Sequence, residues 1–92
     1  MAETIKLPAR MDLSAAQAFV SDLSEKNFSN ELTLDASDVN HIGALCLQAI
    51  IAGARAASEA GGSFVIKDTS EKVQEQLELM GLTVAEIEGG VQ

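Results

Sequence analysis

Three short strand-like segments alternate with helix-like segments along this chain of 92 residues. Residues 4–10 and 31–37 place apolar side chains at alternate positions, which is typical of a strand with one buried face. Residues 63–67 contain the apolar run Phe64-Val65-Ile66, which predicts burial on both faces and a central place in the sheet. Strands separated by helices favour a mainly parallel sheet, because parallel neighbours need crossover connections.

The segments between these strands have apolar residues at helical spacing. The first predicted helix begins near two N-cap candidates, Asp12 and Ser14, and residues 14–17 fit a capping box. Its apolar stripe is Ala16, Phe19, Val20 and Leu23. The second predicted helix runs from Ala44 to about Ala60 and ends at Gly61-Gly62, since glycine accepts the left-handed conformation that closes a helix. Its predicted buried face is Leu47, Ile50, Ile51, Ala54 and Ala57 or Ser58.

A third helix is predicted in the last quarter of the chain, ending at Gly81. Its cap candidates are Asp68, Thr69 and Ser70, and its stripe is Val73, Leu77 and Met80. Apolar residues beyond it indicate a last strand or an extended tail, namely Leu82, Val84 and Ile87. Residues 89–92 are expected to be frayed. The expected fold is a single small α/β domain over residues 1–92, with a mixed, mainly parallel β-sheet and three helices packed against it.

The charge balance restricts the partners of the chain. The net charge is −8, from 14 acidic and 6 basic residues. Nucleic acid and anionic membrane surfaces are therefore excluded as partners, because both require clustered lysine and arginine. The N-terminus lacks a basic region followed by an apolar run, and no apolar stretch approaches membrane-spanning length, so we expect a cytoplasmic protein without membrane insertion. The single cysteine, Cys46, excludes an internal disulfide.

Three blocks of sequence together resemble the STAS domain, the fold of bacterial anti-sigma factor antagonists. Residues 7–12 (LPARMD) are similar to the strand-turn segment of that family that ends in Leu-Asp. Residues 34–39 (LDASDV) resemble its Leu-Asp-x-Ser-x-Val strand end. Residues 70–82 resemble its last helix, which ends in a Gly-Leu pair. The resemblance covers nearly the whole chain and implies the STAS fold.

The resemblance also locates the regulatory site of the family, at the start of the long helix. Antagonists read Asp-Ser-Ser-Gly-Leu there, whereas residues 43–47 of this chain read Gly-Ala-Leu-Cys-Leu. Ala44 stands at the phosphoacceptor position and has no hydroxyl, which implies that this site is not phosphorylated. A Gly-Ala pair at this point is similar to short STAS proteins of bacterial chemotaxis clusters.

The function implied by the resemblance is a non-enzymatic, protein-binding regulator of signal transduction without a cofactor. The implied partner is a kinase with a histidine-kinase-like ATPase domain, of the chemotaxis or anti-sigma type. An alternative is a STAS subunit of an ABC-type lipid transport complex. We expect a monomer or a weak dimer. The predicted partner-binding residues are Asp12, Asp38, Val39, Asn40, His41, Gly43, Ala44, Leu45 and Leu47.

A second alternative is a phosphocarrier that uses His41 or Cys46. A cysteine in the first turn of a helix can be stabilised as a thiolate, although a lone cysteine between two leucines is more often a small hydrophobic residue. His41 is the only histidine, and no second member of a triad or carboxylate pair lies near it in sequence. One histidine and one cysteine provide no metal-binding cluster.

Two further groups of residues leave alternatives open. Asp35, Ser37 and Asp38 follow a strand, where they either shape the turn or contact a partner. Apolar residues around Gly43 form either an exposed interaction patch or part of the core, namely Val39, Ile42 and Leu45.

Overall fold

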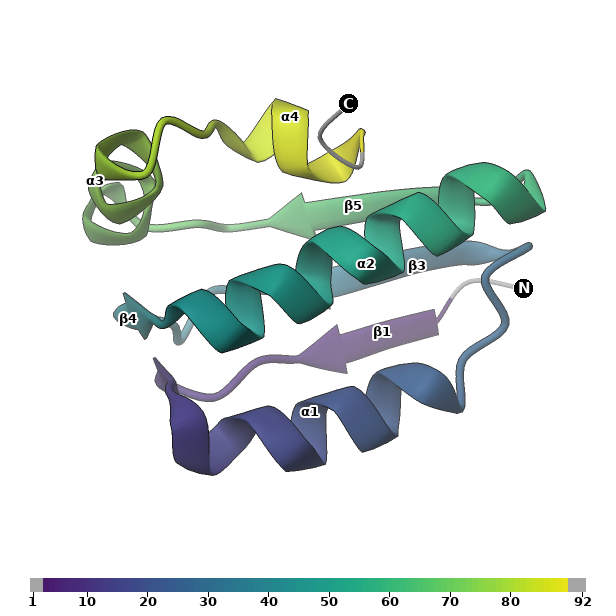
Figure 1. The fold of residues 1–92 in the computed structure, drawn as a ribbon, viewed down its shortest axis with the longest axis horizontal. Helices are drawn as coiled ribbons and strands as arrows, with labels where there is room; N and C mark the ends of the chain where they lie inside the picture. Colours follow the sequence, from purple (N-terminus) through teal and green to yellow (C-terminus); the bar gives the residue numbers. More distant parts are fainter. Residues whose placement is uncertain (1–2, 90–92) are drawn as a thin grey trace.

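The structure is a computed structural model that describes residues 3–89. Its strands are β1 (Glu3–Lys6), β2 (Arg10–Met11), β3 (Glu31–Asp35), β4 (His41–Ile42) and β5 (Ser63–Lys67). Its helices are α1 (Leu13–Ser24), α2 (Ala44–Ala60), α3 (Glu71–Leu79) and α4 (Val84–Glu88). Figure 1 shows α1 and α2 running alongside one another from the same end of the molecule, with α2 crossing the sheet.

The main sheet has the order β1-β3-β5, and its strands are parallel. Ile5, Leu34 and Ile66 lie side by side across the three strands. A second ladder joins β2 to β4, also in parallel, by pairing Arg10 with His41 and Met11 with Ile42. The predicted α/β fold with a mainly parallel sheet is therefore confirmed.

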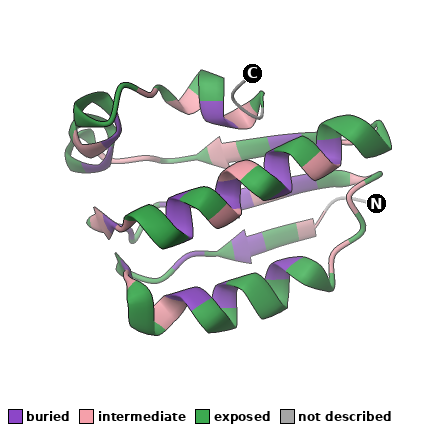
Figure 2. Cartoon of the chain, in the orientation of Figure 1, coloured by how far each residue is buried: buried purple, intermediate pink, exposed green. Residues whose placement is uncertain are grey.

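The predicted central position of β5 is wrong, because β3 lies in the middle and β5 is an edge strand. Leu32 and Leu34 of β3 are fully buried, whereas Val65 of β5 is 40% exposed. Val65 lies beside Thr33 in the register, on a face where Thr4 is also exposed. Within the described residues, the helices bury one face of the sheet and the other stays open, so an apolar run did not mean burial on both faces (Figure 2).

The tail after Gly81 is a helix, so the predicted last strand or extended segment is wrong. Thr83 and Glu86 form a capping box, in which the Glu86 N–H donates to Thr83 Oγ1 at 3.2 Å and the Thr83 N–H donates to Glu86 Oε1 at 3.1 Å. Glu88 Oε2 then accepts a hydrogen bond of 2.7 Å from the Ile66 N–H of β5. α4 therefore satisfies one backbone donor of an edge strand, which protects that strand from pairing with other chains.

The helix boundaries agree closely with the expected ones, but the caps differ in detail. Asp12 is the N-cap of α1, while Ser14 lies inside the helix and donates its backbone N–H to Asp12 Oδ1 at 3.1 Å. Ser70 caps α3, and Gly61 closes α2 with φ +80°. Gly89 follows α4, and residues 90–92 of the expected frayed end lie outside the described residues.

The core lies between the helix-facing side of the sheet and the helices. Its largest fully buried side chains are Met11, Leu32, Leu34, Ile50 and Ile87, together with Cys46. Gly53 lets α2 approach closely, because a Cβ there would lie 3.0 Å from Leu23 Cδ2 and 3.2 Å from Phe64 Cε1. Four residues of the predicted stripes are not buried: Val20, Met80 and Ser58 are exposed, and Ile51 is half-buried.

Candidate functional site

The starts of α1 and α2 are held together at one end of the molecule by backbone hydrogen bonds. The Gly43 N–H donates to Met11 O at 2.7 Å, and the Asn40 N–H donates to Ala9 O at 2.8 Å. A Cβ at Gly43 would lie 3.2 Å from Met11 O, so glycine permits this close approach. The β2–β4 ladder therefore brings Asp12 beside the beginning of α2.

Seven of the nine predicted partner-binding residues reach the surface here. Asp38, Asn40, Ala44 and Leu45 are exposed, and Asp12, His41 and Gly43 are half-buried. We call these seven residues the α2-start surface. Val39 and Leu47 are buried in the core, so their prediction as surface contacts is wrong. The apolar patch proposed for Val39, Ile42 and Leu45 does not form, because Leu45 is the one member that is exposed.

α3 and its N-cap residue hold the segment between β3 and α2 by two hydrogen bonds. Gln76 Oε1 accepts a hydrogen bond of 2.9 Å from the Ile42 N–H, and the Ser70 hydroxyl donates to Val39 O at 3.5 Å. Gln76 was not among the residues predicted from the sequence. Its position three residues after the buried Val73 was the available signal, since that spacing places it at the edge of the buried stripe.

The acidic residues after β3 shape the turn. Asp35 Oδ1 accepts a hydrogen bond of 3.0 Å from the Ser37 N–H. Lys6 Nζ lies 3.7 Å from Asp35 Oδ2 and 3.5 Å from Asp38 Oδ2. The hydrogen bonds from Ser37, assisted by the charges of Lys6 and Lys67, lower the pKa of Asp35. The turn-forming alternative is thus present in the structure for Asp35, while Asp38 stays exposed.

Asp35→Asn should make the stability of the protein less dependent on acid. A carboxyl with a lowered pKa stabilises the fold above its unfolded pKa, near 3.8, and this stabilisation is lost as the pH falls through the lower folded value. Urea unfolding at pH 7 and pH 2 should show a smaller loss for Asp35→Asn than for the wild type. Asp22→Asn removes the same charge from the exposed face of α1 and serves as the control. Equal acid losses in all three proteins would contradict this account.

Asp12 links the two helix starts. Its carboxylate caps α1, and the hydroxyl of Ser14, followed by the Ala15 N–H and Arg10, lowers its pKa. Its backbone oxygen lies 3.4 Å from Cys46 Sγ in α2 and accepts the S–H hydrogen bond. The conformation at Asp12 therefore affects the ends of both helices.

An open groove, which was not predicted from the sequence, runs between α1 and α2. Leu13, Val20 and Leu45 on its sides are 76%, 48% and 51% exposed. The floor and remaining sides are small or polar, namely Ala16, Gln17, Ser21, Gln48 and Ala49. These eight residues are the α1–α2 groove below.

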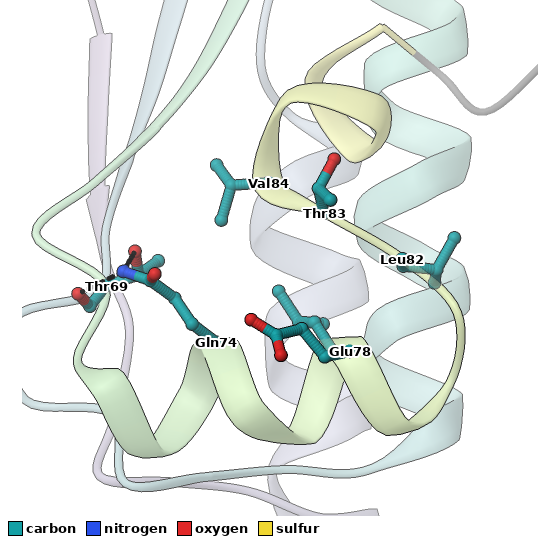
Figure 3. Close-up of a pocket in the computed structure, with 7 residues that line it drawn as sticks. Thr69, Gln74, Glu78, Leu82, Thr83 and Val84 are labelled. Carbon is teal, nitrogen blue, oxygen red and sulfur yellow. Dashed lines mark hydrogen bonds between the residues drawn. The ribbon is translucent and has the colours of Figure 1, made fainter.

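A smaller hollow of about 190 Å³ lies between α3 and α4 (Figure 3). Gln74 on one side donates from Nε2 to Thr69 O at 3.2 Å and to Thr69 Oγ1 at 3.1 Å. Its lining has one carboxylate, Glu78, and no basic side chain. Within residues 3–89, no three His, Cys, Asp or Glu side chains come together as a metal site.

A comparison with protein families identifies the family of this chain. The model of the family described as "Mlab, STAS domain" matches residues 2–88. The chain belongs to the STAS domain family. No curated protein matches the chain significantly. STAS domains are in general regulatory modules that bind other proteins and are not enzymes, and none of the helices described here is long and apolar enough to cross a membrane.

In this STAS domain, Ala44 is the first residue of α2 and is exposed. Gly43, the N-cap, provides no side-chain hydrogen bond to the helix. The position that the resemblance assigns to the phosphoacceptor is therefore open to a partner but has a methyl group in place of a hydroxyl.

Of the two interpretations of Cys46, the structure favours a small core residue over a stabilised thiolate. The side chain is fully buried, and burial, followed by the charge of Asp12, raises the pKa of the thiol. The start of a helix would favour a thiolate, but the loss of hydration outweighs this effect. Cys46 thus matches the more common role of a lone cysteine between two leucines, a small core residue.

Cys46 should consequently react very slowly with thiol reagents in the folded STAS domain. We expect labelling by a disulfide reagent at pH 8 to be on the order of 100-fold slower than in 8 M urea, because the reagent needs an exposed thiolate. Absorbance of the released thiol measures both rates. Equal rates in the folded and unfolded protein would show that the α2 start opens freely.

Proposed function

We propose that this STAS domain is a non-enzymatic cytoplasmic regulator that docks through the α2-start surface onto a kinase with a histidine-kinase-like ATPase domain. The observation that supports this most is the exposed Ala44 at the first residue of α2, in a surface without a catalytic arrangement. The family resemblance allows a chemotaxis or an anti-sigma kinase, and the Gly43-Ala44 pair favours the chemotaxis type.

The composition of the α2-start surface supports a contact with a basic or polar partner. Asp12 and Asp38 supply negative charge, and Asn40 supplies an amide that can donate and accept hydrogen bonds. Leu45 supplies an exposed apolar side chain to the same surface. Protein interfaces usually combine apolar and polar side chains in this way.

The absence of a hydroxyl at position 44 has a consequence for regulation. Phosphorylation at a helix start adds a charge of about −1.5 to −2, which switches binding on or off. Ala44 cannot receive that group, so binding here is constitutive and the regulation acts through the concentration or the state of the partner.

A second candidate is a permanent subunit of an ABC-type lipid transport complex that holds the ATPase subunit through the same surface. Constitutive binding through Ala44 favours it, because a structural subunit needs no switch. The phosphocarrier alternative has less support for Cys46, since Cys46 is buried and its thiol has a raised pKa. His41 is half-buried in the α2-start surface, and the phosphate-labelling assay below tests it.

Ala44→Asp should weaken partner binding by about tenfold or more, because the new charge must lose its hydration inside the interface. Folding should not suffer, since a carboxylate at a helix start is favourable. Calorimetry with the purified partner measures the affinity, and thermal unfolding checks the fold. Ala18→Asp places the same charge on an exposed position of α1 and should bind like the wild type. Unchanged affinity of Ala44→Asp would move the interface elsewhere.

A kinase assay tests the activity itself. Adding the STAS domain to the kinase should change the rate of autophosphorylation or of phosphate loss, and the STAS domain should remain unlabelled. Stable phosphate on any residue from 40 to 47 would contradict the proposal. Unchanged kinase rates, together with binding to a transporter ATPase, would favour the second candidate.

A further inference from the structure

The surface of α1 and α2 is unusually poor in charge. These helices, with 12 and 17 residues, contain three charged side chains, Asp22, Arg55 and Glu59. The whole chain has 14 acidic and 6 basic residues, so charge is concentrated outside this pair of helices. Depletion of charge combined with exposed large apolar residues is typical of the centre of a protein interface.

The α1–α2 groove has the geometry that accepts a third helix. Leu13, Gln17 and Val20 are spaced i, i+4 and i+7 along α1, and Leu45 and Ala49 are spaced i and i+4 along α2. The two helices run side by side in the same direction (Figure 1). Two such stripes bound a groove into which the apolar face of an additional helix can pack.

We infer that the α1–α2 groove binds an amphipathic helix of a partner protein, with an apolar stripe flanked by basic residues. The net charge of the chain favours a basic helix over a second copy of the chain as the molecule bound in the groove. At net −8, two copies of this chain repel one another, whereas a basic helix is attracted to it. The groove itself has no charge to desolvate, so the apolar stripe of the helix can enter it while the basic flanks are attracted by the net negative charge of the chain.

The length of the groove sets the length of the helix. Leu13 and Val20 are seven residues apart, which corresponds to about 10 Å along a helix axis. An occupant of roughly three turns therefore covers the three exposed anchors, Leu13, Val20 and Leu45. Leu45 also belongs to the α2-start surface, so the inference extends the proposed function and rests on it in part.

The test uses a synthetic helical peptide of about 18 residues, with leucines at i, i+4 and i+7 and lysines on the flanks. Titrated into the ¹⁵N-labelled protein, it should shift the amide signals of α1 and α2 around the groove. Val20→Lys should weaken this binding by about tenfold or more. Val65→Lys is the matched control, because Val65 is similarly exposed on the open face of the sheet and should bind like the wild type.

Two control peptides separate the contribution of the leucine spacing from that of the positive charge. A peptide with the same composition but a scrambled leucine spacing should bind at least about tenfold more weakly, and so should one with glutamate in place of lysine. The inference fails if the scrambled peptide binds equally well, if Val20→Lys and Val65→Lys behave alike, or if the signals of the groove shift with protein concentration alone. The last result would assign the groove to a second copy.

Failure of the groove to bind the peptide can be distinguished from failure of the α2-start surface to bind the ATPase. Ala44→Asp should weaken binding to the ATPase without weakening binding of the lysine peptide, because it adds no positive charge to the groove. Peptide binding without any ATPase binding would overturn the proposed function alone. ATPase binding without peptide binding would overturn the helix-binding groove alone.

Discussion

Gly62→Ala is expected to destabilise the fold severely. A Cβ at this position would overlap Phe28 O and lie 2.5 Å from Asn30 O and 2.9 Å from the carbonyl carbon of Ser29. These atoms belong to the backbone before β3, which also receives the Ser63 N–H at Asn30 O, so the loop must move for alanine to fit. We expect a loss of about 4 kcal/mol or more, which is a large part of the stability of a typical small domain.

Urea unfolding followed by circular dichroism measures this loss, with Gly61→Ala as the control. Gly61 has φ +80° but no atom within 4 Å of a Cβ, so alanine there meets backbone strain alone. That strain costs about 1 kcal/mol. If Gly62→Ala were no less stable than Gly61→Ala, the close approach of the α2–β5 turn to residues 28–30 would be wrong.

Leu34→Ala should lower the free energy of unfolding by about 3 kcal/mol. Leu34 is fully buried in the central strand, and its removal leaves a cavity that the surrounding sheet and helices fill only in part. Urea unfolding measures the loss of stability. Amide hydrogen exchange checks that the fold is retained.

Val65→Ala tests the strand order at the edge strand β5, as Leu34→Ala does at the central strand β3. Val65 is 40% exposed on an edge strand, so its truncation should cost less than about 1 kcal/mol. A central β5 would make Val65→Ala as costly as Leu34→Ala. That result would contradict the strand order β1-β3-β5.

The succession of strands and helices was predictable because local patterns carry it. The end of α2 at Gly61 and the strand β3 with its alternating Leu32 and Leu34 are both indicated by residues adjacent in the sequence. The position of β5 was not predictable in this way. Its run Phe64-Val65-Ile66 indicates burial, but the exposure of Val65 depends on the absence of helices over one face of the described sheet, which is a property of the tertiary arrangement.

The same distinction holds for the candidate site. The position of Ala44 at the start of α2 follows from the predicted helix boundary. The family resemblance then assigned Ala44 to the phosphoacceptor position. The burial of Leu47 was predicted by the helical spacing of α2, and this prediction conflicted with that of Leu47 as a partner contact. The burial of Val39 depends on the sheet and on α3, which are distant in sequence, so it could not be predicted from local spacing. The helix of residues 84–88 was predictable in principle, since Thr83 and Glu86 have capping-box spacing.

A native pull-down with the tagged STAS domain, with mass spectrometry of the bound proteins, tests the central claim most directly. The account predicts recovery of a kinase with a histidine-kinase-like ATPase domain by the wild type and by Ala18→Asp, and its loss from the Ala44→Asp sample. Recovery of the same proteins by all three, or of no ATPase by the wild type, would contradict it.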